Sequence, residues 1–220
     1  MKYFVFLVAL FLATPAVAQD HVTWTAGITS DYIARGTSQT FNRPAANLGV
    51  SYDNGGWHAG LWTSNVDFGD GTSQEIDFMA SYTHQVSGWA VRYGFGSYNY
   101  LDDPVSYEMV EGSINVSRTF DRLTPSFTVA YSPDYFNVSG PSIWTEAGAT
   151  YTLTDRWSVG GSVARQQIEQ AGQSYNTFNI GTSYVLNDHL TFDVRYADTD
   201  AHNLGPLYEN TFSVSLNASF

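Results

Sequence analysis

Apolar and polar residues alternate along most of the chain. In the first such segment, residues 22–35, one face carries Val22, Trp24, Ala26, Ile28 and Tyr32, and the other carries Thr23, Thr25, Gly27, Thr29 and Asp31. A period of two residues is typical of a β-strand with one apolar and one polar face. The same pattern predicts twelve strands, near residues 22–35, 44–52, 57–66, 74–84, 89–100, 107–120, 124–133, 142–153, 157–167, 175–186, 190–198 and 209–220.

The connections between these segments alternate in length. Short ones fall at 53–56, 85–88, 121–123, 154–156 and 187–189, and longer ones fall near 36–43, 67–73, 101–106, 134–141, 168–174 and 199–208. Short turns at one end and long loops at the other are typical of bacterial transmembrane barrels, whose short turns face the periplasm. We therefore predict an all-β fold, an antiparallel up-and-down transmembrane β-barrel of about twelve strands with both termini in the periplasm.

The N-terminus has the features of a secretory signal. Lys2 precedes an apolar run from Tyr3 to Leu12, and Ala16-Val17-Ala18 is a small-x-small cleavage site. The run is too short to span a bilayer. We therefore expect residues 1–18 to be a signal peptide, residues 19–220 to form the barrel, and the mature protein to reside in the bacterial outer membrane.

Composition narrows the class of partner. The chain has no cysteine, and its formal charge is −12 with Lys2 as its sole lysine. Nucleic-acid-binding proteins are usually basic, so we expect no nucleic-acid partner. Aromatic residues make up 16% of the chain, which suits a protein with aromatic belts at two membrane interfaces.

Aromatic residues recur beside the short turns. Three tryptophans begin the strand after such a turn, and four tyrosines precede one: Trp57, Trp89, Trp157, Tyr52, Tyr82, Tyr151 and Tyr184. We predict that they form a girdle at the periplasmic membrane interface. The alternative is that they pack the ends of a soluble sandwich.

The last strand alternates cleanly and ends on an aromatic residue. Its apolar face includes Phe212, Val214, Leu216 and Phe220. This pattern resembles the C-terminal signal by which the barrel assembly machinery recognises its substrates. We therefore expect that machinery, together with outer-membrane lipid and lipopolysaccharide, among the partners of the chain.

Four motifs resemble those of one family. Residues Ser30 to Gln39, Trp62 to Asp70, Glu75 to Phe78 and Tyr131 to Phe136 are similar to motifs of the TorF family of porins, an outer-membrane β-barrel family of the Gcw_chp type. The resemblance covers residues 20–140 well and the remainder only in pattern. It implies an outer-membrane barrel that passes small solutes.

The polar faces of the strands predict which charged side chains line the lumen. By parity these are Asp31, Arg35, Glu75, Asp77, Arg92, Glu111, Glu146, Asp193 and Arg195. One interpretation is a wet channel that weakly prefers cations, because six of the nine are acidic. The other is a plugged barrel held by internal ion pairs, for example Arg35 with Asp31 or Glu75. Residues 35–39 and 65–70 could fold a loop inward as a constriction, or they could only form turns.

Nothing in the sequence favours catalysis, a cofactor or a metal. The five histidines, His21, His58, His84, His189 and His202, have no nucleophile that spacing places beside them. The run from Asp67 to Gly71 does not have the spacing of an EF-hand. Three hypotheses follow: a porin or narrow channel for small hydrophilic solutes, a closed structural barrel that acts through its loops, and, more remotely, a lipid-modifying hydrolase.

Overall fold

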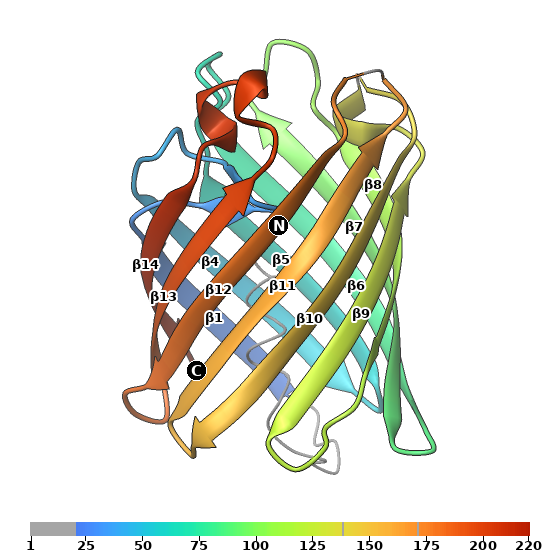
Figure 1. Cartoon of the computed structure of the whole chain (residues 1–220), viewed down its shortest axis with the longest axis vertical. Coiled ribbons are helices and arrows are strands. Elements are labelled where there is room, and N and C mark those ends of the chain that lie inside the picture. The colour runs from blue at the N-terminus through green and yellow to red at the C-terminus, as the bar shows by residue number, and fades with distance from the viewer. Residues whose placement is uncertain (1–20, 138, 171) are drawn as a thin grey trace.

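The computed structural model describes residues 21–137, 139–170 and 172–220. Twelve of the fourteen strands in these residues form one closed antiparallel barrel (Figure 1). They are β1 (His21–Thr29), β4 (Ala45–Asn54), β5 (Trp57–Asn65), β6 (Gln74–Val86), β7 (Trp89–Leu101), β8 (Met109–Ser117), β9 (Leu123–Ser132), β10 (Ser142–Thr154), β11 (Trp157–Ile168), β12 (Tyr175–Val185), β13 (Leu190–Thr199) and β14 (Thr211–Ser219). The predicted fold class is confirmed.

The first strand closes the barrel. Each barrel strand pairs with its neighbour in the chain, and β1 pairs with both β4 and β14, so that Thr25 lies opposite Gly49 on one side and Ser219 on the other. Closure leaves no strand edge with unpaired backbone groups. The predicted signal peptide lies outside the described residues.

The two ends of the barrel differ as the connection lengths predict. Short turns gather at the lower end in Figure 1, and the longer connections rise from the upper end. The upper connections contain three short 3₁₀ helices, η1 (Tyr135–Asn137), η2 (His202–Leu204) and η3 (Pro206–Tyr208). None of the helices in the described part of the chain is long and apolar enough to cross a membrane.

The first predicted strand is too long. It was expected over residues 22–35, but β1 ends at Thr29 and the chain then turns inward. The Thr29 hydroxyl donates to the Asp31 carbonyl oxygen at 2.8 Å, which stabilises the turn. Tyr32, predicted on the outer apolar face, is instead fully buried inside the barrel.

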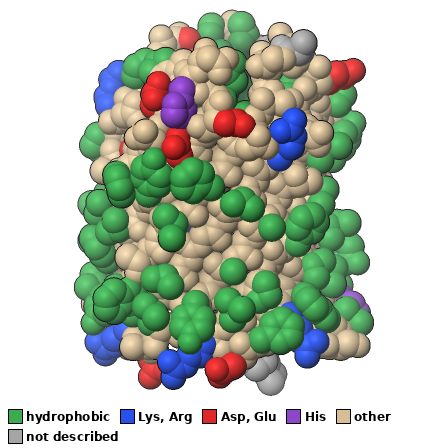
Figure 2. Space-filling model, in the orientation of Figure 1, with side chains coloured by type: hydrophobic (Ala, Val, Ile, Leu, Met, Phe, Trp, Pro, Cys, Tyr) green, Lys and Arg blue, Asp and Glu red, His purple; other side chains and the backbone are tan. Residues whose placement is uncertain are grey.

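The outer surface is apolar around the barrel wall. Figure 2 shows hydrophobic side chains over the flank of the barrel and charged side chains mainly toward its two ends. Trp24, Leu48 and Phe212 are each more than 60% exposed. A soluble protein rarely exposes so much contiguous apolar surface, whereas a membrane barrel requires it.

Candidate functional site in the barrel lumen

The inner wall changes character along the barrel. In the half with the short turns it carries small residues such as Ser51, Gly94, Ser183 and Ser215. In the half with the long loops it carries large side chains that are almost fully buried: Trp62, Tyr98, Tyr100, Met109, Trp144 and Tyr175. The lumen is therefore roomy toward the short turns and filled toward the long loops.

A cavity of about 420 Å³ occupies the roomy half. It extends from the turn at Asn187–His189 to the inward-folded segment that follows β1, where it is bounded by Arg35, Trp62 and Trp144. Part of its wall carries hydroxyl and amide groups, such as those of Ser51 and Asn179, which can both donate and accept hydrogen bonds, and the rest includes charged and many apolar side chains. Such a wall can contact water and small polar solutes.

A small hairpin forms the roof of this cavity. Its strands β2 (Ile33–Ala34) and β3 (Thr37–Ser38) pair with each other and are joined by Arg35 and Gly36. Both turn residues have positive φ, 52° and 83°, which is the geometry of a tight two-residue turn. A Cβ atom on Gly36 would lie 2.0 Å from the Thr177 hydroxyl oxygen, so the hairpin tip can approach the wall only because this residue is glycine.

Asp31 holds the base of the hairpin. Its Oδ1 accepts hydrogen bonds from the hydroxyls of Ser38 at 2.7 Å and Thr40 at 3.0 Å. Its Oδ2 accepts one from Thr211 of β14 at 3.2 Å. The carboxylate thus joins both ends of the hairpin to the barrel wall. Tyr32 adds an edge-to-face contact with Trp62 of β5, with ring centroids 5.5 Å apart.

Arg35, at the hairpin tip, crosses the lumen to three other strands. Its Nη2 lies 2.5 Å from Glu111 Oε2 of β8, and its Nη1 donates to Gln166 Oε1 of β11 at 2.9 Å. Its guanidinium carbon lies 4.8 Å from the centroid of the Trp144 ring of β10. A buried ion pair of this kind is stable only with good geometry and further hydrogen bonds, both of which are present.

A second acidic group lies across the lumen on β6. Glu75 and Asp77 are fully buried, and the Tyr100 hydroxyl donates to Glu75 Oε1 at 2.9 Å. Tyr32 also hydrogen-bonds to Glu75, which ties the hairpin to this strand. The loop half of the lumen therefore combines acidic groups with tyrosine hydroxyls.

A chain of hydrogen bonds runs along the wall of the cavity from β10 to β13. Ser162 donates to Glu146 Oε2 at 3.2 Å, and Asn179 donates to Ser162 at 2.6 Å. Arg195 then donates to Asn179 Oδ1 at 2.6 Å and pairs with Asp193 at 3.4 Å. These contacts fix the charged groups of the wall in place.

The sequence matches one family model over residues 13–220, nearly the whole chain. The chain belongs to the Gcw_chp family. The description of that family is "bacterial protein of unknown function". A comparison with curated proteins finds no match.

Several solved structures share the fold of this Gcw_chp chain. The NanC porin is 12% identical with a TM-score of 0.62, over 91% of this chain and 99% of that one. The KdgM porin is 11% identical with a TM-score of 0.64, over 90% and 98%. An outer membrane channel from Pseudomonas putida F1 is 8% identical with a TM-score of 0.56, over 93% and 96%. At these identities the likeness supports the barrel fold and no finer property.

All nine charged residues predicted for the lumen of the Gcw_chp barrel lie on its inner side. They are Asp31, Arg35, Glu75, Asp77, Arg92, Glu111, Glu146, Asp193 and Arg195. The structure brings Arg35 together with Glu111, and Arg195 with Asp193, whereas Arg92 donates to the Thr83 hydroxyl at 3.3 Å. The suggested pairing of Arg35 with Asp31 or Glu75 is wrong, because the tight turn directs the guanidinium across the lumen toward β8. Contact with passing solutes stays a prediction.

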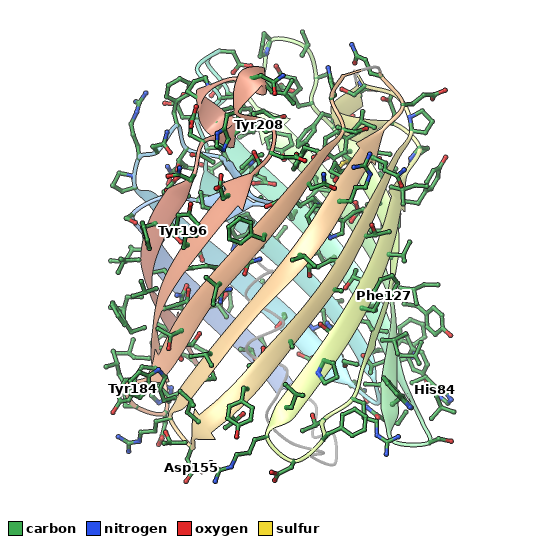
Figure 3. The ribbon with its side chains drawn as sticks, viewed as in Figure 1. His84, Phe127, Asp155, Tyr184, Tyr196 and Tyr208 are labelled. Carbon is green, nitrogen blue, oxygen red and sulfur yellow. The ribbon has the colours of Figure 1, made fainter. Side chains whose placement is uncertain are left out.

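The residues that were predicted to form the aromatic girdle lie near the short turns. They are Trp57, Trp89, Trp157, Tyr52, Tyr82, Tyr151 and Tyr184, and Figure 3 shows Tyr184 near the lower end. Two ring pairs join neighbouring strands, Trp57 with Tyr82 at 4.9 Å and Trp157 with Tyr184 at 6.4 Å. Their contact with lipid headgroups stays a prediction.

The predicted assembly signal lies in β14 and at the chain end. Phe212, Val214 and Phe220 are exposed on the outer surface. Phe220 stacks on His189, with ring centroids 5.2 Å apart, and exchanges two backbone hydrogen bonds of 2.9 Å with Trp24. The last residue therefore helps to close the seam between β1 and β14, while recognition by the assembly machinery stays a prediction.

The run from Asp67 to Gly71 forms a loop that is bonded to two neighbouring loops. Asp67 accepts from the Gly69 amide at 2.8 Å and pairs with Arg43 at 3.1 Å. Asp70 accepts from Thr72, and from the Tyr107 hydroxyl at 2.8 Å. Burial and this bond to Asp70 raise the pKa of Tyr107 to about 12. Both carboxylates hold the loop backbone and bind side chains of neighbouring loops.

Two residues of the lumen wall in this Gcw_chp chain were not among the site residues predicted from the sequence. Gln166, which binds Arg35, is fully buried, and Thr177 forms the wall against Gly36. Neither belongs to a motif, because both sit in ordinary alternating strands. A signal for the hairpin does exist: Arg35-Gly36 between Ile33-Ala34 and Thr37-Ser38 is a two-residue turn between short strand-like pairs.

Proposed function

We propose that the chain is an outer-membrane porin of the TorF type, a narrow channel that passes small hydrophilic solutes through the lumen. The observation that carries this proposal is the cavity beneath the hairpin, whose wall includes hydroxyl, amide and charged groups. A barrel that served only as a scaffold would have no need for a polar interior of that size. The apolar flank in Figure 2 supports insertion into a membrane, and export would depend on cleavage of residues 1–18.

The solute class follows from the charge of the lumen. Six acidic residues and three arginines are assigned to it by the alternation of the strands. Carboxylates raise the local concentration of cations, so we expect a weak cation preference that fades as salt screens the field. The KdgM porin has been solved in complex with oligogalacturonate, a polyanion. The acidic balance of this lumen favours the opposite preference.

The test is single-channel recording on purified, refolded protein in planar bilayers. We expect discrete conductance steps and, under a salt gradient, a reversal potential whose sign indicates selectivity for cations. Glu75→Gln together with Asp77→Asn should reduce that preference, whereas Asp155→Asn, at a short turn outside the lumen (Figure 3), should not. Anion preference in the parent protein, or no effect of the double substitution, would contradict the assigned role.

The second candidate is a closed structural barrel. It is favoured by the Arg35–Glu111 pair, which crosses the lumen within a cluster of buried aromatic side chains. Folded, membrane-inserted protein that gives no conductance, with and without the hairpin, would support this candidate. A lipid-modifying hydrolase is the remote alternative, and loss of a lipase activity on substitution of serines and histidines on the outer surface would be needed to support it.

A further inference from the structure

The hairpin is attached to the barrel unevenly. β2 and β3 pair with each other and, among the described residues, with no barrel strand. At the tip, the hydrogen bonds of Arg35 to Glu111 and Gln166 reach the wall through a side chain and not through the backbone. Side-chain bonds can break without disturbing the barrel ladder, so the tip can be released while the barrel stays closed.

The base of the hairpin is held more firmly. Asp31, at one end of the hairpin, is bonded to Ser38 at the other end and to β14, and Tyr32 packs on Trp62. The backbone also contributes, because the Gln39 amide donates to the Tyr32 carbonyl at 2.6 Å. Because the base is firmly bonded and the tip is held by one long side chain, the tip can rotate about a hinge near residue 31.

The space around the hairpin limits where it can move. On the side of the long loops, η3 lies against β3, and Tyr208 packs on Tyr175 with ring centroids 5.5 Å apart. On the side of the short turns lies the 420 Å³ cavity, whose lining includes Arg35 and Gly36. The tip therefore has room to tilt toward the short turns and little room in the other direction.

We infer that residues 31–40 form a hinged gate, held closed by the bond between Arg35 and Glu111, which opens by tilting into the cavity. Opening separates the tip from Thr177 and from the Trp144 face, and it connects the loop side of the lumen with the cavity. This inference rests on the proposed channel function for its biological meaning. The movement itself can be measured without any conductance.

The absence of cysteine from the sequence provides the measurement. Ala34→Cys places a thiol in the hairpin at a position that is 1% exposed, and Ser215→Cys places one in the open cavity as a reference. Both proteins are refolded into vesicles and treated with a charged maleimide. We expect slow labelling at residue 34 and fast labelling at residue 215. If Ala34→Cys does not fold, Thr37→Cys reports on the same hairpin.

The decisive comparison adds Arg35→Gln to the Ala34→Cys protein. We expect labelling to accelerate by about tenfold or more, because local opening sets the reactivity of a buried thiol. Arg165→Gln is the matched control: Arg165 precedes Gln166 in β11, is exposed on the outer surface, and bonds to Asn176 at 3.0 Å. The exchanged pair Arg35→Glu with Glu111→Arg should restore slow labelling. Equal labelling with and without Arg35→Gln would overturn the inference.

Conductance then separates the gate from the channel. If the gate and the channel are both right, Arg35→Gln increases the open probability or the step size, and the exchanged pair reverses the change. Faster labelling without conductance in any variant would leave the gate standing and remove the channel. Conductance in the parent protein with no response of labelling or current to Arg35→Gln would keep the channel and remove the gate.

Discussion

Two neighbouring residues of β6 test which side of the wall faces lipid. Ala80 is exposed on the outer face, where it lies between Ala59 and Phe95 of the adjacent strands. Ser81 faces the lumen between His58 and Gly94. The pair offers two arginine substitutions at the same depth but on opposite faces of one strand.

The position of Ala80 sets the size of the effect. β6 has 13 residues from Gln74 to Val86, so six residues lie on each side of Ala80. With a rise of about 3.4 Å per residue and a tilt of about 40°, each side covers roughly 15 Å along the membrane normal. Ala80 thus lies at the middle of the strand, and an outward arginine costs about 2–4 kcal/mol at the membrane midplane and less toward an interface such as the one assigned to Tyr82, two residues away.

We expect Ala80→Arg to lower the free energy of unfolding by an amount at the lower end of that range, about 2 kcal/mol, which is a change of about 30-fold in the folding equilibrium. Ser81→Arg should cost less than about 1 kcal/mol, because the guanidinium stays hydrated in the roomy half of the lumen. Urea titration of the protein in lipid vesicles, followed by tryptophan fluorescence, measures both. Ala80→Leu controls for size alone and should cause no loss. Equal losses for the two arginine variants would refute the assignment of the faces.

Three further predictions address the seam, the hairpin and a loop. Deletion of Phe220 removes its two backbone bonds to Trp24, so we expect less heat-modifiable barrel in the outer membrane; normal levels would argue against an assembly role. Gly36→Ala should cost at least about 1–2 kcal/mol in urea unfolding, because its φ of 83° disfavours a side chain and Thr177 blocks the Cβ; an unchanged midpoint would contradict the close approach. A hydrogen bond to Asp198 raises the pKa of His202, so the protonated form stabilises the loop at residues 200–210 below its ordinary pKa of about 6.5, and this stabilisation is lost as pH rises through the raised pKa. Protease cleavage of that loop should therefore speed up with pH in the parent protein and not in His202→Gln.

The alternation of residues was sufficient to predict the barrel. One-sided patterning fixes which face of each strand is outward, and the lengths of the connections order the strands around the ring. Parity therefore also placed residues such as Glu111 and Asp193 inside the barrel. The parity rule holds for residues within a hydrogen-bonded barrel strand, because side chains there point alternately to the two faces of the wall.

The assignment of inner and outer faces by parity fails where the chain leaves the barrel strands. From Ser30 onward the facing of each residue is set by the turn at Asp31 and by the two-residue turn at Arg35-Gly36, so Tyr32 points inward against its predicted side. The partner of Arg35 could not be predicted from the sequence either. Which strand a side chain meets across a lumen depends on strand tilt and stagger, and neither quantity is encoded in the alternation itself.

The size of the ring explains why the lumen is closed by inserted backbone. A barrel of about eight strands is filled by its own side chains, and one of 16 or more is open. A ring of twelve strands is between these limits, and here Trp62 and Tyr98 of the wall pack in one buried cluster with Tyr32 and Ala34 of the inserted segment. A plug built from one segment between β1 and β4 differs from a plug built from the wall, because it can be moved without rearranging any strand. In the gate proposed above, the same twelve-stranded ring is closed or open according to the position of that segment, and the bond from Arg35 at its tip to Glu111 holds it closed.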